Sequence, residues 1–207
     1  GMGGSSLGAE VISLVLGQDS GLRLHVLDSI VPSAVARIRD SVDLKRTVFI
    51  VASKSGSTLE PNFLYEYFRF RIEQQTNGTH AGEHFIAITD PESSLHKLAN
   101  ESGFRAVFLN PSDIGGRYSV LSLFGLVPGA LAGANISNLR DSGARMARTC
   151  QPGEMHDPNP GVALGTYMAG CVRAGRDKLT IVLSPTLRSF GWWVEQLVAE
   201  STGKQGT

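Results

Sequence analysis

Short, mostly apolar runs alternate along this chain with longer segments of helical periodicity, and this alternation constrains the fold more than any other feature. The expected strands are Leu22–Asp28, Thr47–Ser53, His84–Thr89, Arg105–Asn110 and Lys178–Ser184. The expected helices are Ser6–Leu16, Pro32–Arg39, Thr58–Gln75, Glu92–Ser102, Val120–Leu131, Asn138–Thr149, Gly161–Ala174 and Leu187–Ala199. Continuously apolar strands are typical of parallel sheets covered on both faces. The pattern predicts an α/β sandwich with a mainly parallel, doubly wound sheet.

A segment rich in proline and glycine interrupts this pattern late in the chain. Gln151–Gly161 reads QPGEMHDPNPG, which is typical of a linker. We therefore expect a first lobe at residues 1–150, a linker at residues 151–161, and the start of a second, incomplete lobe at residues 162–207.

Composition excludes several classes of function. The chain has 207 residues, and its 19 basic residues balance its 19 acidic ones, so no overall field attracts nucleic acid or an anionic membrane. Cys150 and Cys171 are too few for a disulfide framework, and neither a membrane span nor a signal peptide is recognisable. We expect a cytoplasmic protein that binds neither nucleic acid nor membrane. Any anion that it binds must be held by a specific group of residues, because the net charge is zero.

The motif SKSGST follows the expected strand Thr47–Ser53 and precedes a long expected helix. Ligands bind at the carboxyl ends of such strands, and the first turn of a helix attracts anions. The hydroxyl groups of Ser53, Ser55, Ser57 and Thr58 add hydrogen-bond donors, and this arrangement favours phosphate binding. An alternative is that Ser57 and Glu60 only form a capping box; both interpretations can hold together.

Three further motifs carry polar or glycine residues at expected helix ends. GMGGSS at the start of the chain is a second glycine-rich turn before a helix. GGRYS places Arg117 after a glycine pair, where a guanidinium can face a developing oxyanion. Gln196 and Glu200 lie one helical turn apart, so their side chains share one face. Taken singly, Arg117 is better explained as a surface arginine beside a turn, and Glu200 as a solvated carboxylate near a helix end.

Taken together and in this order, GMGGSS, SKSGST, GGRYS and ESTGK resemble the glucose-6-phosphate isomerases, which are built from two sugar-isomerase (SIS) domains. The resemblance spans the whole chain and is strongest to bacterial forms, including the isomerase half of transaldolase–phosphoglucose isomerase fusions. It implies an SIS-type αβα sandwich, a sugar-phosphate substrate, a homodimer in the native-length protein, and a fused transaldolase domain as a candidate partner.

The resemblance also assigns roles to individual residues. It implies that Glu200 is the catalytic base and that Arg117 stabilises the enediolate. The implied substrate- and phosphate-binding residues are Gly4, Ser5, Ser53, Lys54, Ser55, Thr58 and Gln196. Moving one proton between C1 and C2 of a sugar needs a carboxylate and a fixed cation, so we expect neither a cofactor nor a metal.

Two other functions stay open from the sequence. A sugar-phosphate-binding module without turnover would keep the hydroxyl-rich loop but would not need Arg117 and Glu200 in one pocket. A dinucleotide-dependent enzyme would bind NAD, although the glycine-rich turn is not G-x-G-x-x-G and only Asp28 ends the next expected strand.

The chain itself is expected to be a fragment of the enzyme, inactive toward the cyclic sugar. Gly1 opens directly on a phosphate-type turn without the strand that usually precedes one, and the chain ends soon after Glu200. In relatives, the histidine and lysine that help to open the sugar ring lie beyond the ESTGK motif.

Overall fold

The computed structural model describes residues 1–17, 21–76, 80–152 and 159–203. Contacts between Cα atoms divide the chain into two compact units. The first unit contains Gly1–Ala134 and Pro185–Thr207, and the second contains Asn135–Ser184. The two units are described separately below.

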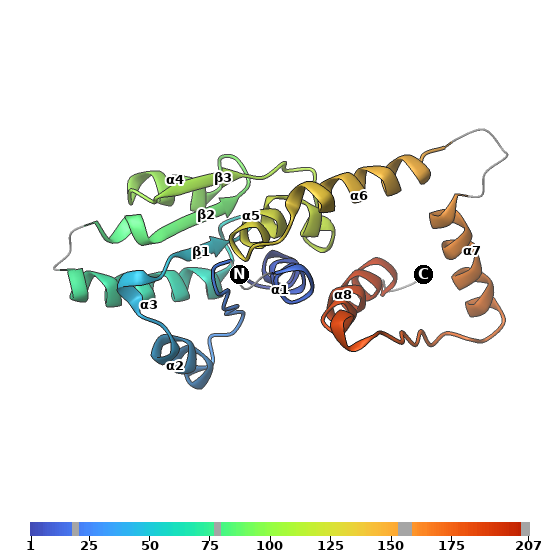
Figure 1. The fold of residues 1–207 in the computed structure, drawn as a ribbon, viewed down its shortest axis with the longest axis horizontal. Helices are drawn as coiled ribbons and strands as arrows, with labels where there is room; N and C mark the ends of the chain where they lie inside the picture. The colour runs from blue at the N-terminus through green and yellow to red at the C-terminus, as the bar shows by residue number, and fades with distance from the viewer. Residues whose placement is uncertain (18–20, 77–79, 153–158, 204–207) are drawn as a thin grey trace. The chain divides into compact units, whose positions relative to one another are not determined.

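A parallel sheet of three strands forms the centre of the first unit (Figure 1). Its strands are β1 (Phe49–Ala52), β2 (Phe85–Thr89) and β3 (Ala106–Leu109), in the order β1-β2-β3. In the register of the sheet, Val51 lies beside Ala87 and Ala87 beside Val107. Every residue of β2 is buried, as expected for a central strand covered on both faces. The predicted parallel α/β sandwich is confirmed.

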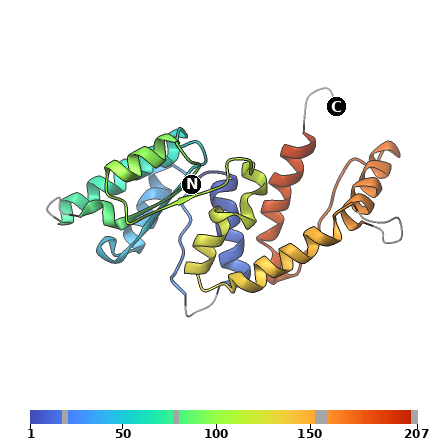
Figure 2. The same ribbon diagram turned by 90° about the horizontal axis from the view of Figure 1, so that it is seen from above.

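Each helix expected from the sequence is present, with bounds shifted by a few residues. The first unit contains α1 (Gly4–Leu16), α2 (Pro32–Ser41), α3 (Leu59–Thr76), α4 (Ser94–Glu101), α5 (Leu123–Leu131) and α8 (Phe190–Thr202). The second contains α6 (Ile136–Thr149) and α7 (Pro160–Arg173), whose course can be followed in Figure 2. Short 3₁₀ turns lie at Leu44–Arg46, Ala81–His84, Gly116–Leu121 and Pro185–Leu187. Among the described helices, none has both the length and the apolar character that crossing a membrane requires.

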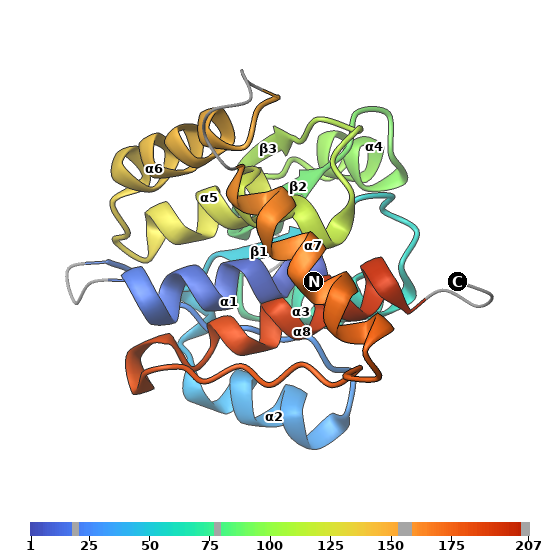
Figure 3. The ribbon, with the colours of Figure 1, turned by 90° about the vertical axis from the view of Figure 1, so that its right-hand side faces the viewer.

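Side chains of the sheet alternate between two cores because successive strand residues point to opposite faces. On one face, Ala87 belongs to a cluster with Phe68 of α3 and Leu95 of α4. On the other, Ile88 packs with Phe124 of α5. Helix α1 contacts α5 and also α8, and α1 and α8 run side by side in Figures 1 and 3. These contacts place the amino-terminal turn of the chain against α8.

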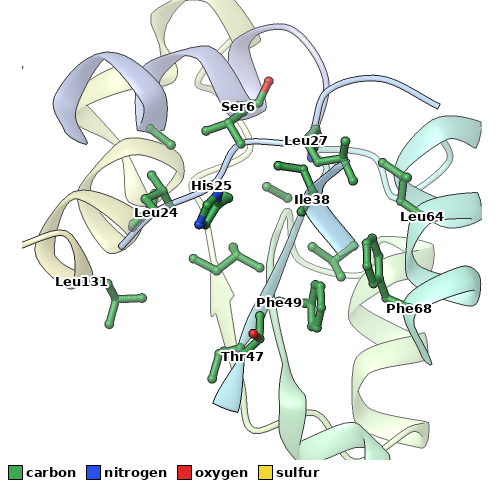
Figure 4. A pocket seen from close by; sticks show the side chains of 18 of the residues that line it. Ser6, Leu24, His25, Leu27, Ile38, Thr47, Phe49, Leu64, Phe68 and Leu131 are labelled. Carbon is green, nitrogen blue, oxygen red and sulfur yellow. Dashed lines mark hydrogen bonds between the residues drawn. The ribbon is translucent and has the colours of Figure 1, made fainter. Parts of the chain in front are cut away.

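Two of the expected strands are wrong. Lys178–Ser184 pairs with no strand among the described residues, because the described part of its unit contains no sheet to join. Leu22–Asp28 also forms no ladder. A cavity of about 440 Å³ lies between this segment and β1; it is lined by side chains that include Leu24, Leu27 and Phe49 (Figure 4). An apolar run becomes a strand only when a partner lies within hydrogen-bonding distance.

The division into lobes at residues 1–150 and 162–207, with a linker at 151–161, stays a prediction. Residues 153–158 of the expected linker lie outside the described residues. Of the described part, Asn159 caps α7 by accepting hydrogen bonds from the amides of Gly161 and Val162, and its side-chain nitrogen donates to the Cys150 carbonyl at 2.6 Å. Helix α8 groups with the first compact unit.

The packing of α3 leads to a first prediction about stability. Phe68 is 3% exposed and stacks on Phe49 with ring centroids 4.6 Å apart, whereas Phe63 on the same helix is 61% exposed. Phe68→Ala should lower the free energy of unfolding by about 3–5 kcal/mol, because it leaves a cavity in the core. Phe63→Ala should change it by about 0.5 kcal/mol or less. Urea denaturation of both variants measures this difference, and equal losses would contradict the packing described.

The amino terminus gives a second prediction. The Gly1 amino group lies 3.5 Å from the Leu27 carbonyl. Burial lowers the pKa of this amino group from 8.0 to about 6, although the Asp28 carboxylate acts in the opposite direction. Between pH 6 and pH 8 the unfolded chain therefore binds a proton that the folded chain does not, so the free energy of unfolding rises with pH in this range, by at most about 3 kcal/mol from this group.

Acetylation of Gly1 removes this titration and leaves the other groups unchanged. The acetylated chain should show a smaller rise in unfolding free energy between pH 6 and pH 8 than the unmodified chain. Equal rises in the two forms would show that the amino group titrates normally.

Candidate active site

The loop between β1 and α3 is folded tightly around Gly56. Gly56 has a φ of 71°, and a Cβ atom at this position would lie 2.4 Å from the Leu95 amide nitrogen, so only glycine fits. The Ser53 hydroxyl, which is buried, accepts a hydrogen bond from the Gly56 amide at 3.2 Å. The Asn62 side chain donates to the Gly56 carbonyl at 3.1 Å. The buried Ser53 side chain thus stabilises the conformation of the loop through this hydrogen bond.

The remaining hydroxyl groups of the loop lie outside, at the start of α3. The Ser55 and Ser57 hydroxyls are 2.7 Å apart, and the Ser57 amide donates to the Ser55 hydroxyl at 3.2 Å. Ser55 and Ser57 are exposed, and Thr58 directly precedes α3, a helix of 18 residues. Ser57 therefore contacts Ser55 rather than forming the expected capping box with Glu60. Exposed hydroxyls beside the amides of a first helical turn suit an anion.

Lys54 is placed differently from the other polar residues of the loop. Its ammonium group donates to the Asp90 carboxylate and, at 2.7 Å, to the Ser112 carbonyl. Its side chain is 35% exposed. The structure therefore joins Lys54 to the segments that follow β2 and β3.

The amino-terminal turn connects the sheet to the GGRYS segment. At one end, a Cβ atom on Gly1 would lie 2.9 Å from the Ala52 carbonyl at the end of β1. At the other, a Cβ on Gly4 would lie 2.2 Å from the Gly116 carbonyl, so a side chain is excluded there. The Ser119 hydroxyl donates to the Gly4 carbonyl at 3.1 Å. Ser5, which the sequence also indicates, is partly buried in this turn.

Arg117, Gln196 and Glu200 lie together, as the family resemblance implies. An Arg117 terminal nitrogen is 3.8 Å from a Glu200 carboxylate oxygen, and the Gln196 amide donates to the other oxygen at 2.8 Å. The Glu200 side chain is 47% exposed and that of Arg117 is 25% exposed. The Gln196 amide nitrogen would also lie 3.2 Å from a Cβ atom on Gly3. This face of α8 therefore borders the amino-terminal turn.

Sequence reasoning missed the residues that hold Arg117. The Arg117 Nε donates to the Ser201 hydroxyl at 2.9 Å, and the Trp193 indole donates to the Arg117 carbonyl at 3.2 Å. The guanidinium lies over the Tyr118 ring, 4.6 Å from its centroid. Positions 193, 196 and 200 share one helical face, and this spacing could have indicated Trp193.

The arrangement can perform proton transfer next to a stabilised oxyanion. A carboxylate accepts and returns a proton, and a guanidinium held by the Ser201 hydroxyl and the Tyr118 ring can stabilise negative charge that develops on a neighbouring oxygen. In the part of the chain that the structure describes, no group of three or more His, Cys, Asp or Glu residues could hold a metal ion.

Comparison with known proteins identifies the family to which the chain is similar. The sequence profile of the phosphoglucose isomerase family matches residues 1–207. The chain is 32% identical over 209 residues to glucose-6-phosphate isomerase of Parasynechococcus marenigrum, covering 99% of this chain and 38% of that protein. It is 34% identical over 204 residues to the probable glucose-6-phosphate isomerase of Haloquadratum walsbyi, covering 99% of this chain and 46% of that protein. It thus spans less than half the length of these relatives.

Solved structures show the same fold. A hypothetical protein from Thermus thermophilus superposes with a TM-score of 0.84 and 29% identity, covering 99% of this chain and 48% of that one. A glucose-6-phosphate isomerase from Chlamydia trachomatis superposes with a TM-score of 0.80 and 29% identity, covering 98% of this chain and 39% of that one. The match of the family profile along the whole sequence shows that this chain belongs to the phosphoglucose isomerase family.

Proposed function

We propose that this chain carries the phosphate-binding and proton-transfer groups of an enzyme that interconverts glucose 6-phosphate and fructose 6-phosphate. The observation that carries this proposal is the cluster of Arg117, Gln196 and Glu200 beside the amino-terminal glycine turn. Family membership supports it. Because the chain spans less than half the length of its relatives, the activity is proposed for the protein that contains this sequence.

In the proposed reaction one proton moves between C1 and C2 of the open-chain sugar. The Glu200 carboxylate removes the proton from C1 of the ketose, and the electrons of the C–H bond pass toward the carbonyl oxygen at C2. The Arg117 guanidinium stabilises the resulting enediolate, and the C2 oxygen then gains a proton while the C1 hydroxyl loses one. Glu200 returns the carbon-bound proton to C2 as the carbonyl forms at C1. Gln196 fixes one carboxylate oxygen by its hydrogen bond, so the other faces Arg117.

The loop between β1 and α3 is proposed to bind the phosphate group. Ser55 and Thr58 present hydroxyls at the start of α3, while Ser53 and Lys54 maintain the loop, and Gly4 and Ser5 form the neighbouring turn. A dianionic phosphate accepts several hydrogen bonds, and backbone amides of the first helical turn add to those of the hydroxyls.

We also propose a cytoplasmic location and a homodimer for the protein that contains this chain. The two described cysteines are free, which suits a reducing compartment. Whether a transaldolase domain accompanies this sequence is decided by the native reading frame.

The main alternative is a sugar-phosphate-binding protein without turnover. We favour turnover because a guanidinium 3.8 Å from a carboxylate supplies the two groups that proton transfer needs, whereas binding alone does not require them. Binding of fructose 6-phosphate without any proton exchange would favour this alternative. Binding of NAD in a titration would instead favour the dinucleotide enzyme that the sequence left open.

The phosphate loop gives the third prediction. The double variant Ser55→Ala/Thr58→Val should weaken fructose 6-phosphate binding, since each lost hydrogen bond to a charged group costs about 1.5–3 kcal/mol. Binding of unphosphorylated fructose should be unchanged. Calorimetry on the chain measures both, with Ser142→Ala/Thr149→Val on α6 as a matched control. Unchanged affinity for the phosphate ester would remove Ser55 and Thr58 from the site.

The catalytic base gives the fourth prediction. In D₂O, the chain should catalyse deuterium incorporation at C1 of fructose 6-phosphate, a reaction that uses the open-chain fraction of the sugar. Glu200→Gln keeps the shape of the side chain but cannot accept the proton, so the exchange rate should fall by about 10²- to 10⁴-fold. Proton NMR measures this rate.

Glu195→Gln is the matched control, because Glu195 is an exposed carboxylate on the same helix. Its exchange rate should equal that of the parent chain, and both variants should still bind the sugar phosphate. If Glu200→Gln exchanged deuterium at the parent rate, the base would be another residue.

A further inference from the structure

Lys54 and Asp90 contact each other through both backbone and side chains. The Asp90 amide donates to the Lys54 carbonyl at 3.1 Å, and the Lys54 ammonium donates to the Asp90 carboxylate. The buried Thr89 hydroxyl donates to the same Lys54 carbonyl at 3.2 Å. These contacts connect the residue that follows Ser53 at the end of β1 with the residue that follows β2.

The ammonium of Lys54 extends this connection to the third strand. It donates at 2.7 Å to the Ser112 carbonyl, three positions beyond the end of β3 at Leu109. One side chain therefore joins the carboxyl-terminal ends of β1, β2 and β3. Lys54 directly precedes the exposed Ser55 in the chain. It is therefore the last residue of the loop that these contacts hold before Ser55.

The environment of Asp90 makes this pair sensitive to the loss of one partner. The Asp90 side chain is 13% exposed, and its second carboxylate oxygen is buried with no partner among the described residues. A carboxylate held in this way depends on its cation, because removing one partner of a buried pair leaves an uncompensated charge.

We infer that Asp90 is a positioning residue of the phosphate loop, which holds the Lys54 ammonium and so fixes Ser55, Gly56 and Ser57 in the conformation that binds an anion. This inference rests on the proposed function of the loop. It also changes the role of Lys54, whose side chain acts on the loop rather than on the phosphate.

The sign of the effect on binding separates this role from a simple electrostatic one. A carboxylate near an anion site weakens anion binding by repulsion, so its neutralisation alone would strengthen binding. If Asp90 instead acts through Lys54, its neutralisation loosens the loop and weakens binding. The loss of affinity in a variant that lacks both side chains should then be smaller than the sum of the losses in the two single variants.

The first measurement needs no ligand. Amide hydrogen exchange of Gly56 and Ser57, whose amides donate within the loop, should accelerate by about tenfold in Asp90→Asn and in Lys54→Met. Lys54→Arg keeps a cation for Asp90 and should retain most of the protection. Asp177→Asn, which removes the carboxylate of an exposed Lys178 pair, is the matched control. Unchanged exchange in Asp90→Asn would overturn the inference.

The second measurement is the affinity for fructose 6-phosphate. Asp90→Asn should weaken it by about tenfold, on the scale of one lost hydrogen bond to a charged group. The double variant Lys54→Met/Asp90→Asn leaves no buried unpaired charge and should bind about as weakly as either single variant. Tighter binding by Asp90→Asn, or fully additive losses, would overturn the inference.

The two measurements separate this inference from the proposed function. If the parent chain does not bind fructose 6-phosphate, the proposed function of the loop is wrong, and amide exchange still decides whether Asp90 fixes the loop. If Asp90→Asn alone fails to fold, the double variant and Lys54→Arg decide it by the same exchange measurement.

Discussion

Parallel pairing of β1, β2 and β3 is the constraint on which the site depends. Because the strands run in one direction, the segments that follow them meet at one edge of the sheet. The loop with Ser55 follows β1, Asp90 follows β2, and Asn110 follows β3. Asn110 is fully buried; it accepts a hydrogen bond from the Leu123 amide at 3.2 Å and so connects this edge to α5. An antiparallel arrangement would send alternate segments to opposite edges.

A second constraint links this edge to Arg117, Gln196 and Glu200. The amino-terminal turn touches the end of β1 through Gly1 and the GGRYS segment through Gly4, and both contacts exclude a side chain. The backbone of this turn therefore separates the loop proposed to bind phosphate from the cluster of Arg117, Gln196 and Glu200. Glycine at these positions follows from close packing as much as from the need to approach a ligand.

The sequence predicted helices and strands better than it predicted contacts between distant segments. Helix periodicity located α1 to α8, and continuous apolar runs located β1, β2 and β3, because both signals arise from neighbouring residues. A similar apolar run predicted a strand at Leu22–Asp28 incorrectly, because a segment forms a strand only if it finds a partner strand elsewhere in the chain. Motif spacing brought Gln196 and Glu200 together correctly, since one helical turn separates them.

Contacts between distant segments could not be predicted from local patterns. Lys54 belongs to a phosphate-type motif, yet its ammonium group is held by Asp90, which is 36 positions away. Ser201, the partner of Arg117, is 84 positions away from it. The family resemblance supplied Arg117 and Glu200 as a pair, but not the side chains that orient them, because a motif gives residue types and not their hydrogen bonds.

The environment of Arg117 also has an optical consequence. The guanidinium lies over the ring of Tyr118, and the Trp193 indole is hydrogen bonded to the Arg117 carbonyl. One intrinsic fluorophore thus contacts the guanidinium of Arg117, and a second contacts its backbone carbonyl. Trp192 and three other tyrosines also emit, so a Trp192→Phe variant would make Trp193 the one tryptophan that reports on the surroundings of this arginine.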